Sequence, residues 1–158
     1  VSSAGDVNGD GLNDWVIGSP GFDVNGTSSG RTYVIFGNTG NTDIQLSNIV
    51  NGTGGFIING QAADDQVGYS VSSAGDVNGD GLADVIVGSS NASRAYVVFG
   101  KSSNTTAIDL SALTSGSSTL GFVINGTSLV TGNTSGLEIG GDEQQRGLCF
   151  DSLDARRL

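Results

Sequence analysis

The sequence predicts an all-β protein assembled from repeated four-stranded antiparallel sheets, and three observations support this fold class. Gly accounts for 27 of the 158 residues, and clusters of Gly, Asn, Asp and Ser recur along the chain. Short apolar segments lie between these clusters, and hydrophobic residues make up 36% of the chain, too much for a solvated disordered segment. The third observation is an internal repeat, in which both kinds of segment return in the same order.

The internal repeat is clearest in two nearly identical stretches. Val1 begins VSSAGDVNGDGLNDWVIGSP and Val71 begins VSSAGDVNGDGLADVIVGSS, so the offset is 70 residues and the first twelve positions are identical. The sequence GRTYVIFG at Gly30 returns as SRAYVVFG at Ser93, and GFIING at Gly55 returns as GFVING 66 residues later. A unit of roughly 60 to 70 residues is typical of solenoids, propellers or arrays.

Each unit is expected to contain four short strands. In the second unit, segments rich in Val, Ile, Tyr and Phe and bounded by turn-forming residues predict strands at Gln66–Ser73, Asp84–Gly88, Ala95–Phe99 and Gly121–Asn125. The runs VIV and YVVF are continuously apolar, which predicts strands buried on both faces of the sheet. Four-stranded sheets covered on both faces by neighbouring sheets are the blades of a β-propeller.

The chain is expected to hold about two blades and part of a third. We predict an N-terminally incomplete blade at residues 1–54, a second blade at 55–120, and a partial third blade with a divergent tail at 121–158. Because a closed ring takes about 4 to 8 blades, the chain is expected to be a fragment of a larger propeller or to assemble with copies of itself. For 138–158, where charged residues become frequent, a terminal non-repeat segment and an out-of-frame end both remain open.

Composition and charge exclude several function classes. Six basic against sixteen acidic residues give a net charge of −10, which disfavours nucleic acid and anionic membrane as partners and favours cations. The longest apolar run, Ala95 to Phe99, is far too short for a membrane helix, so no membrane insertion is expected. The chain has no His, and its single cysteine, Cys149, has no partner for a disulfide. We therefore expect no catalytic activity.

Two acidic loops, DVNGDGLND and DVNGDGLAD, carry the strongest chemical signal. Each places oxygen-bearing side chains at positions 1, 3, 5 and 9, and the backbone carbonyl at position 7 can add a further oxygen. Ca²⁺ takes about 6 to 8 oxygen ligands, and three carboxylates this close repel one another strongly without a cation. We therefore predict two Ca²⁺ sites. The predicted ligands are Asp6, Asn8, Asp10, Leu12 and Asp14 in the first loop, and Asp76, Asn78, Asp80, Leu82 and Asp84 in the second.

Two other interpretations of these loops were weighed. An EF-hand requires a bidentate Glu at position 12 and flanking helices, but position 12 here is Ile17 or Val87 inside an apolar strand. An Asp/Asn/Gly hairpin turn without metal is the other alternative, although a simple turn does not explain why one ligand set occurs twice.

The repeated residues resemble the FG-GAP repeats of the integrin α-chain β-propeller and their bacterial relatives. Phe-Gly occurs at 36–37 and at 99–100, and GSP at 18–20 stands in the place of GAP, whereas GSS at 88–90 departs from that motif. The resemblance covers roughly residues 1–127, and the repeats are worded more like those of a bacterial surface or secreted protein. It implies a seven-bladed propeller in the intact protein, Ca²⁺ in hairpin loops on one face, and an extracellular setting.

Taken together, these expectations describe a calcium-binding module of an extracellular or cell-surface protein that acts in adhesion or ligand recognition. Its expected partners are Ca²⁺, an extracellular protein or polysaccharide, and either the remaining propeller blades or copies of itself. The alternative is a structural repeat segment that calcium stabilises and that is attached to a secreted enzyme or surface-layer protein. Trp15 replaces Val85 of the second copy and is expected to pack in the core at a strand start.

Overall fold

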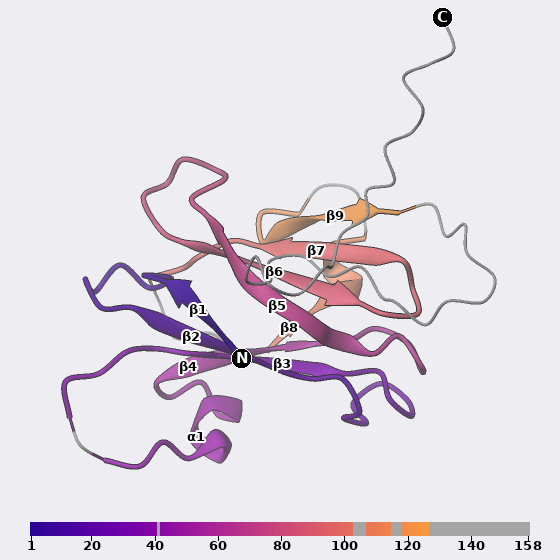
Figure 1. Ribbon diagram of the computed structural model, residues 1–158, viewed down its shortest axis with the longest axis horizontal. Helices are drawn as coiled ribbons and strands as arrows, with labels where there is room; N and C mark the ends of the chain where they lie inside the picture. Colours follow the sequence, from indigo (N-terminus) through magenta and orange to yellow (C-terminus); the bar gives the residue numbers. More distant parts are fainter. Residues whose placement is uncertain (41, 103–106, 115–117, 127–158) are drawn as a thin grey trace, which may run out of the picture.

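The computed structural model describes residues 1–40, 42–102, 107–114 and 118–126, and their strands form two stacked sheets (Figure 1). Helical structure within these ranges is limited to α1 (Leu46–Val50) and the single-turn 3₁₀ helix η1 (Leu110–Ala112). The all-β prediction is therefore confirmed. None of the helices in the described part of the chain is long and apolar enough to cross a membrane.

The first sheet contains four antiparallel strands and one short parallel strand at its edge. Its order is β1-β2-β3-β4-β8, with β8 parallel to β4. The strands β1 to β4 follow one another along the chain, whereas β8 comes from the loop between β7 and β9 of the other sheet. The bounds are β1 Ser2–Gly5, β2 Asp14–Ser19, β3 Arg31–Ile35, β4 Gly55–Asn59 and β8 Ile108–Asp109.

The second sheet has the order β5-β6-β7-β9, and all of its pairs are antiparallel. Its bounds are β5 Val67–Gly75, β6 Asp84–Ser89, β7 Arg94–Val98 and β9 Gly121–Asn125. All four strands predicted in this unit are present, with ends that differ by at most two residues. Two four-stranded antiparallel sheets stacked face to face are consistent with consecutive propeller blades.

The sheets divide the chain at different points from the predicted blade boundaries. β4 was placed in the second blade, but it pairs with β3 along its whole length, from Arg31↔Asn59 to Ile35↔Gly55. In the same way, β9 is not the start of a third blade but the fourth strand of the second sheet. The sheets therefore span residues 2–59 and 67–125, because backbone pairing, and not the start of the sequence repeat, decides which strands form one blade. Residues 127–158 lie outside the described part of the chain.

The main hydrophobic core lies between the two sheets. Val16 and Val34 of the first sheet and Val87 and Tyr96 of the second are fully buried there. A second cluster covers the opposite face of the first sheet, where Ile49 of α1 packs on β3 and β4 (Figure 1). The apolar runs of β6 and β7 are thus buried on both faces, as predicted.

Trp15 does not pack in this core. Its side chain is exposed, whereas the equivalent Val85 is fully buried. The difference arises because Val85 faces the first sheet, while Trp15 lies on the opposite face of its own sheet, where the described residues do not cover it. The expectation that Trp15 is a core residue was wrong.

Candidate metal centre

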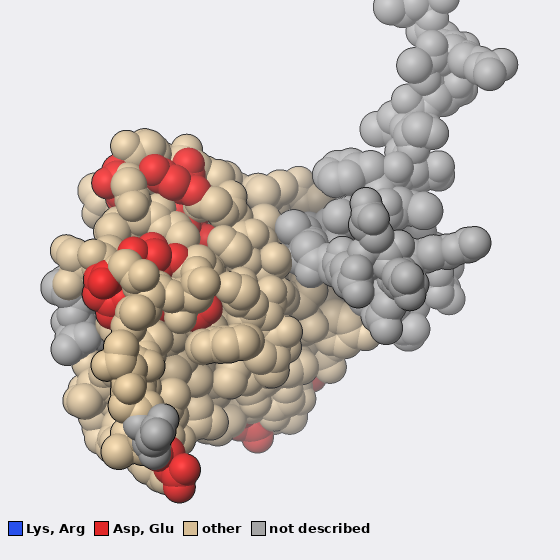
Figure 2. All heavy atoms as spheres, turned by 60° about the vertical axis from the view of Figure 1, so that its left-hand side comes forward, with Lys and Arg blue, Asp and Glu red and all other residues tan. Residues whose placement is uncertain are grey.

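The two acidic loops connect β1 to β2 and β5 to β6, and they lie side by side at one end of the stacked sheets. The backbone N–H of Ala83, in the second loop, donates to the carbonyl of Asp6 in the first at 2.8 Å. The N–H of Lys101 donates to the neighbouring Val7 carbonyl at 2.9 Å. Figure 2 shows the acidic side chains of this end as two adjacent patches. The fold has therefore brought together two loops that are 70 residues apart in sequence.

In the first loop, the carboxylate of Asp6 organises the turn. Its Oδ1 accepts from the N–H groups of Gly9 at 2.7 Å and Asp10 at 3.1 Å, and its Oδ2 accepts from Gly11 at 2.9 Å. The Asn8 amide donates to Asp10 Oδ2 at 2.9 Å and accepts from the Asp10 N–H at 3.0 Å. The first three predicted ligands, Asp6, Asn8 and Asp10, therefore form one connected cluster of oxygen atoms.

The second loop repeats this arrangement. Asp76 accepts from Gly79, Asp80 and Gly81 at 2.7, 3.1 and 2.9 Å, and Asn78 bridges to Asp80 at 2.8 Å. Gly79 and Gly81 have φ values of 79° and 89°, which residues with a Cβ rarely adopt. The sequence thus specifies the same loop conformation twice, as the paired glycines predict.

Asp14 and Asp84, the last predicted ligands, are fully buried and hold the loops to the sheets. Asp14 accepts from the Val7 N–H through Oδ2 and from the Gly37 N–H through Oδ1, both at 2.7 Å. Asp84 accepts from Val77 and Gly100 in the same way, both at 2.8 Å. Each carboxylate therefore connects the start of its loop to the residue after the Phe of the Phe-Gly pair, which follows the third strand.

Burial raises the pKa of Asp14 above its ordinary value of 3.8, because removing the carboxylate from water disfavours its charged form. The two backbone hydrogen bonds oppose this rise, and the nearby charges of Asp10 and Asp6 add to it. The three acids of the first loop therefore interact electrostatically although Asp14 has its own hydrogen-bond partners.

The raised pKa of Asp14 predicts a specific pH dependence in metal-free buffer. The folded chain holds this proton more tightly than the unfolded chain, so ionisation of Asp14 costs stability as the pH rises from 3.8 through the raised pKa. We expect the free energy of unfolding of the wild type, minus that of Asp14→Asn, to fall across this range in urea denaturation with a chelator present. A difference that increases with pH would contradict a raised pKa.

The donor set fits a hard cation, although the side chains do not form one complete shell. Within the described ranges, no three acidic side chains converge closely enough to share a metal ion. The loop carboxylates and the Asn8 amide are nevertheless all oxygen donors, and a carboxylate that accepts backbone hydrogen bonds keeps lone pairs for a cation. Ligation by Asp14, Asp84 and the carbonyls of Leu12 and Leu82 stays a prediction.

The glycine of each Phe-Gly pair is needed because the acidic loop packs against it. A Cβ on Gly100 would lie 2.6 Å from the Ala83 carbonyl oxygen and 2.7 Å from the Leu82 Cβ. A Cβ on Gly37 would lie 2.5 Å from the Asn13 carbonyl oxygen. Real Cβ atoms essentially never approach so closely, so the loop would have to move.

We expect Gly100→Ala to lower the free energy of unfolding by about 1 to 3 kcal/mol, as overpacking of a tight site does. Gly21→Ala is a matched control, because nothing lies within 4 Å of its Cβ position, and it should change stability by less than about 0.5 kcal/mol. Urea denaturation of both variants measures the effect, and equal stabilities would show that the loop adapts without cost.

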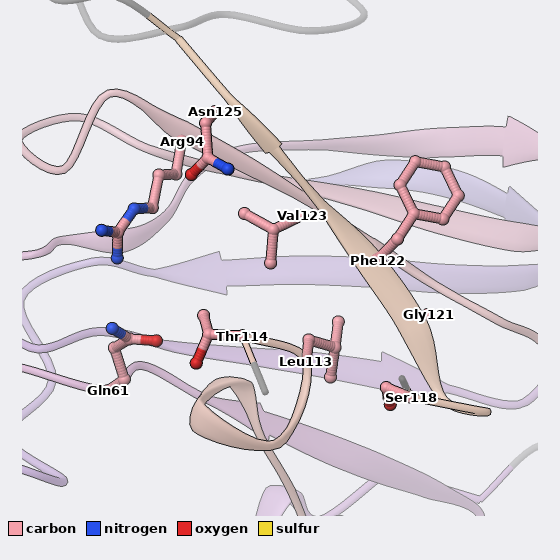
Figure 3. Close-up of a pocket in the computed structure, with 9 residues that line it drawn as sticks. All are labelled: Gln61, Arg94, Leu113, Thr114, Ser118, Gly121, Phe122, Val123 and Asn125. Atoms are coloured by element: carbon pink, nitrogen blue, oxygen red, sulfur yellow. The ribbon is translucent and has the colours of Figure 1, made fainter. Parts of the chain in front are cut away.

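A separate open cleft of about 730 Å³ lies between β9 and the η1 segment (Figure 3). Its charged lining residue is Arg94, and the other polar side chains that line it are Gln61, Thr114, Ser118 and Asn125. No residue of either acidic loop lines this cleft. It is therefore a separate feature from the candidate metal centre.

The family comparison decides what kind of repeat this is. The family model of the FG-GAP repeat matches residues 1–35 and 67–106. The chain carries two FG-GAP repeats. Each match includes one acidic loop together with the strands on either side of it. No curated protein matches the chain.

The sequence analysis missed what the Phe-Gly pair of each FG-GAP repeat does. Its glycine supplies an N–H to Asp14 or Asp84 and leaves the space into which the acidic loop packs. Phe36 packs edge-to-face against Phe56, with ring centroids 6.0 Å apart. The recurrence of Phe-Gly after the third strand was the available signal, but its partner residues are 16 to 23 positions away.

Proposed function

We propose that the two FG-GAP repeats bind one Ca²⁺ ion each in their acidic loops. The observation that carries this proposal is the connected oxygen cluster of Asp6, Asn8 and Asp10, which recurs at Asp76, Asn78 and Asp80 with matching hydrogen-bond distances. Backbone N–H groups orient these side chains, so little conformational freedom remains to be lost on binding.

Electrostatics supports a cation as the ligand of these loops. The oxygen clusters are solvent-accessible, and the two loops contact each other, so their negative charges add over one small surface. A bound Ca²⁺ would supply positive charge to this surface, and the donors that would hold it are the side-chain oxygens of the loops. The chain as a whole has a net charge of −10, which two Ca²⁺ ions would change to −10 + 4 = −6.

We further propose that this is a non-catalytic module of an extracellular or cell-surface protein that acts in adhesion or ligand recognition. The resemblance to integrin-type repeats supports this role, and an extracellular protein or a polysaccharide is the ligand class to test. A purely structural segment attached to a secreted enzyme or surface-layer protein is the second candidate. The buried Asp14 and Asp84 favour that second role, because they show how strongly each loop is integrated into its sheet.

Isothermal titration calorimetry with Ca²⁺ tests the metal sites. We expect two sites per chain, and we expect Asp10→Ala combined with Asp80→Ala to abolish both. Asp43→Asn is the control, because Asp43 is an exposed acid outside both loops, and it should leave the number of sites unchanged. Absence of heat at millimolar Ca²⁺ would refute the metal assignment.

A pull-down against matrix proteins and polysaccharides separates recognition from a structural role. We expect binding in Ca²⁺ that is lost in chelator if the loops take part in recognition. Binding retained in chelator would exclude a metal-dependent mechanism, and absence of binding under both conditions would favour the structural segment.

A further inference from the structure

A short sequence that both repeats contain has two very different environments in this structure. The segment Ile44–Ser47 reads IQLS and the segment Ile108–Ser111 reads IDLS, 64 positions later. Both lie between the third and fourth strands of their own sheets. Their equivalence therefore allows the contacts of one segment to serve as a template for the other.

The second of these segments docks on the neighbouring sheet. Ile108 and Asp109 form β8, which pairs in parallel with Ile58 and Asn59 of β4. The Asn59 amide donates to the Asp109 carboxylate at 3.0 Å. Ile108 and Leu110 are only 3% and 0% exposed, since they enter the core between the sheets. This segment thus joins the second repeat to the outer strand of the first.

The first segment makes no such pairing within the described residues. Ile44 and Leu46 are 47% and 41% exposed, although they correspond to the buried Ile108 and Leu110. Trp15 is exposed on the same side of the first repeat, and its equivalent Val85 is buried. We call Trp15, Ile44 and Leu46 the leading face.

The opposite side of the molecule shows the complementary exposure. β9 is equivalent to β4, but it lies at the edge of its sheet among the described strands. Phe122 and Ile124 are 43% and 40% exposed, whereas their equivalents Phe56 and Ile58 are fully buried beneath the second repeat. In Figure 3, Val123 points toward Leu113 and Phe122 points to the other side of β9.

The acidic loops show the same asymmetry. Val7 is buried because the second repeat covers the first loop, and its carbonyl accepts from Lys101. Val77, the equivalent residue of the second loop, is half exposed. Val77, Phe122 and Ile124 form what we call the trailing face.

We propose that the trailing face of one chain binds the leading face of a second copy, with Ile44–Leu46 added as a parallel strand along β9. The argument for this occupant is continuity, since each face repeats the residues that form the contact between the two repeats inside the chain. Gln45 stands where Asp109 stands, and its amide oxygen can accept from Asn125 as Asp109 accepts from Asn59. Because the two faces differ, the association is head-to-tail.

Sedimentation velocity tests this proposal with one variant of each face. Wild type should associate as its concentration rises. The leading-face variant Ile44→Asp/Leu46→Asp and the trailing-face variant Phe122→Asp/Ile124→Asp should each be monomeric. A mixture of the two should form a one-to-one heterodimer and no larger species, because each retains one intact face. Val50→Asp is the control, since Val50 is exposed but lies outside both faces, and it should associate as wild type does.

Three results would overturn the proposal. These are a wild type that stays monomeric at submillimolar concentration, a mixture that stays monomeric, and a Val50→Asp variant as defective as the two face variants. A monomeric wild type would leave both faces to a different repeat protein. Circular dichroism melting shows whether each variant is folded, and Ser replaces Asp at the same positions if a variant is not.

Discussion

Replacing Asp84 by Ala is expected to cost about 2 to 5 kcal/mol of the free energy of unfolding, measured in chelator by urea denaturation. The carboxylate is fully buried and accepts from the N–H groups of Val77 and Gly100. Its removal leaves the Gly100 donor buried without a partner, and an unsatisfied buried donor costs about 1 to 3 kcal/mol. The second donor and the vacated space add to this loss.

The matched control is Asp80→Ala in the same loop. Asp80 is exposed and accepts from the Leu82 N–H and the Asn78 amide at a surface where water can replace it. In chelator it should cost less than about 1 kcal/mol. Asp84→Asn should fall between the two, because the amide retains one acceptor oxygen. Equal losses in Asp80→Ala and Asp84→Ala would show that the buried hydrogen bonds do not dominate.

Calcium is expected to stabilise the chain strongly if both loops bind it. At a free concentration one hundred times the Kd, each site adds about 2.7 kcal/mol by mass action, so two independent sites add roughly 5 kcal/mol. For a protein of this length, 1 kcal/mol shifts Tm by about 2 to 4 °C, so a total increase of roughly 10 to 20 °C is expected. Scanning calorimetry over a Ca²⁺ series measures this shift.

Variants of single loops provide the control for this increase. Asp10→Ala and Asp80→Ala should each retain about half of the Ca²⁺-dependent rise in Tm, and the double variant should lose all of it. Mg²⁺ at the same concentration should have a smaller effect, because it requires near-octahedral geometry and releases its waters reluctantly. A Tm independent of Ca²⁺ would leave the acidic loops as hydrogen-bonded turns without metal.

The strands of the second repeat could be predicted closely because their signal is local. Val85, Ile86 and Val87 form a continuous apolar run, with Asp84 on one side and Gly88 on the other, and β6 occupies Asp84–Ser89. The paired glycines of the acidic loops were equally informative, since their positive φ values are a property of single residues.

The contacts between distant segments could not be predicted in the same way. β8 is only two residues long, and it exists because β4 presents an edge with which Ile108 and Asp109 can pair. The blade boundaries were misplaced for a related reason, because Gly55–Asn59 has the same local pattern whichever sheet it joins. The Asp14 contact with Gly37 spans 23 positions and likewise leaves no local mark.

The amino-acid sequence by itself determined the all-β class, the repeat, and the conformation of each acidic loop, because periodic apolar residues, Gly and Asp act over a few neighbouring positions. Only the tertiary structure decided that Asp14 and Asp84 are buried beneath the loops, which strands share a sheet, and which apolar side chains remain exposed. These outcomes depend on what packs against each residue, as Ile44 and Ile108 show. The same short sequence is exposed in one repeat and buried in the other, because a neighbouring sheet edge lies beside the second segment and not beside the first.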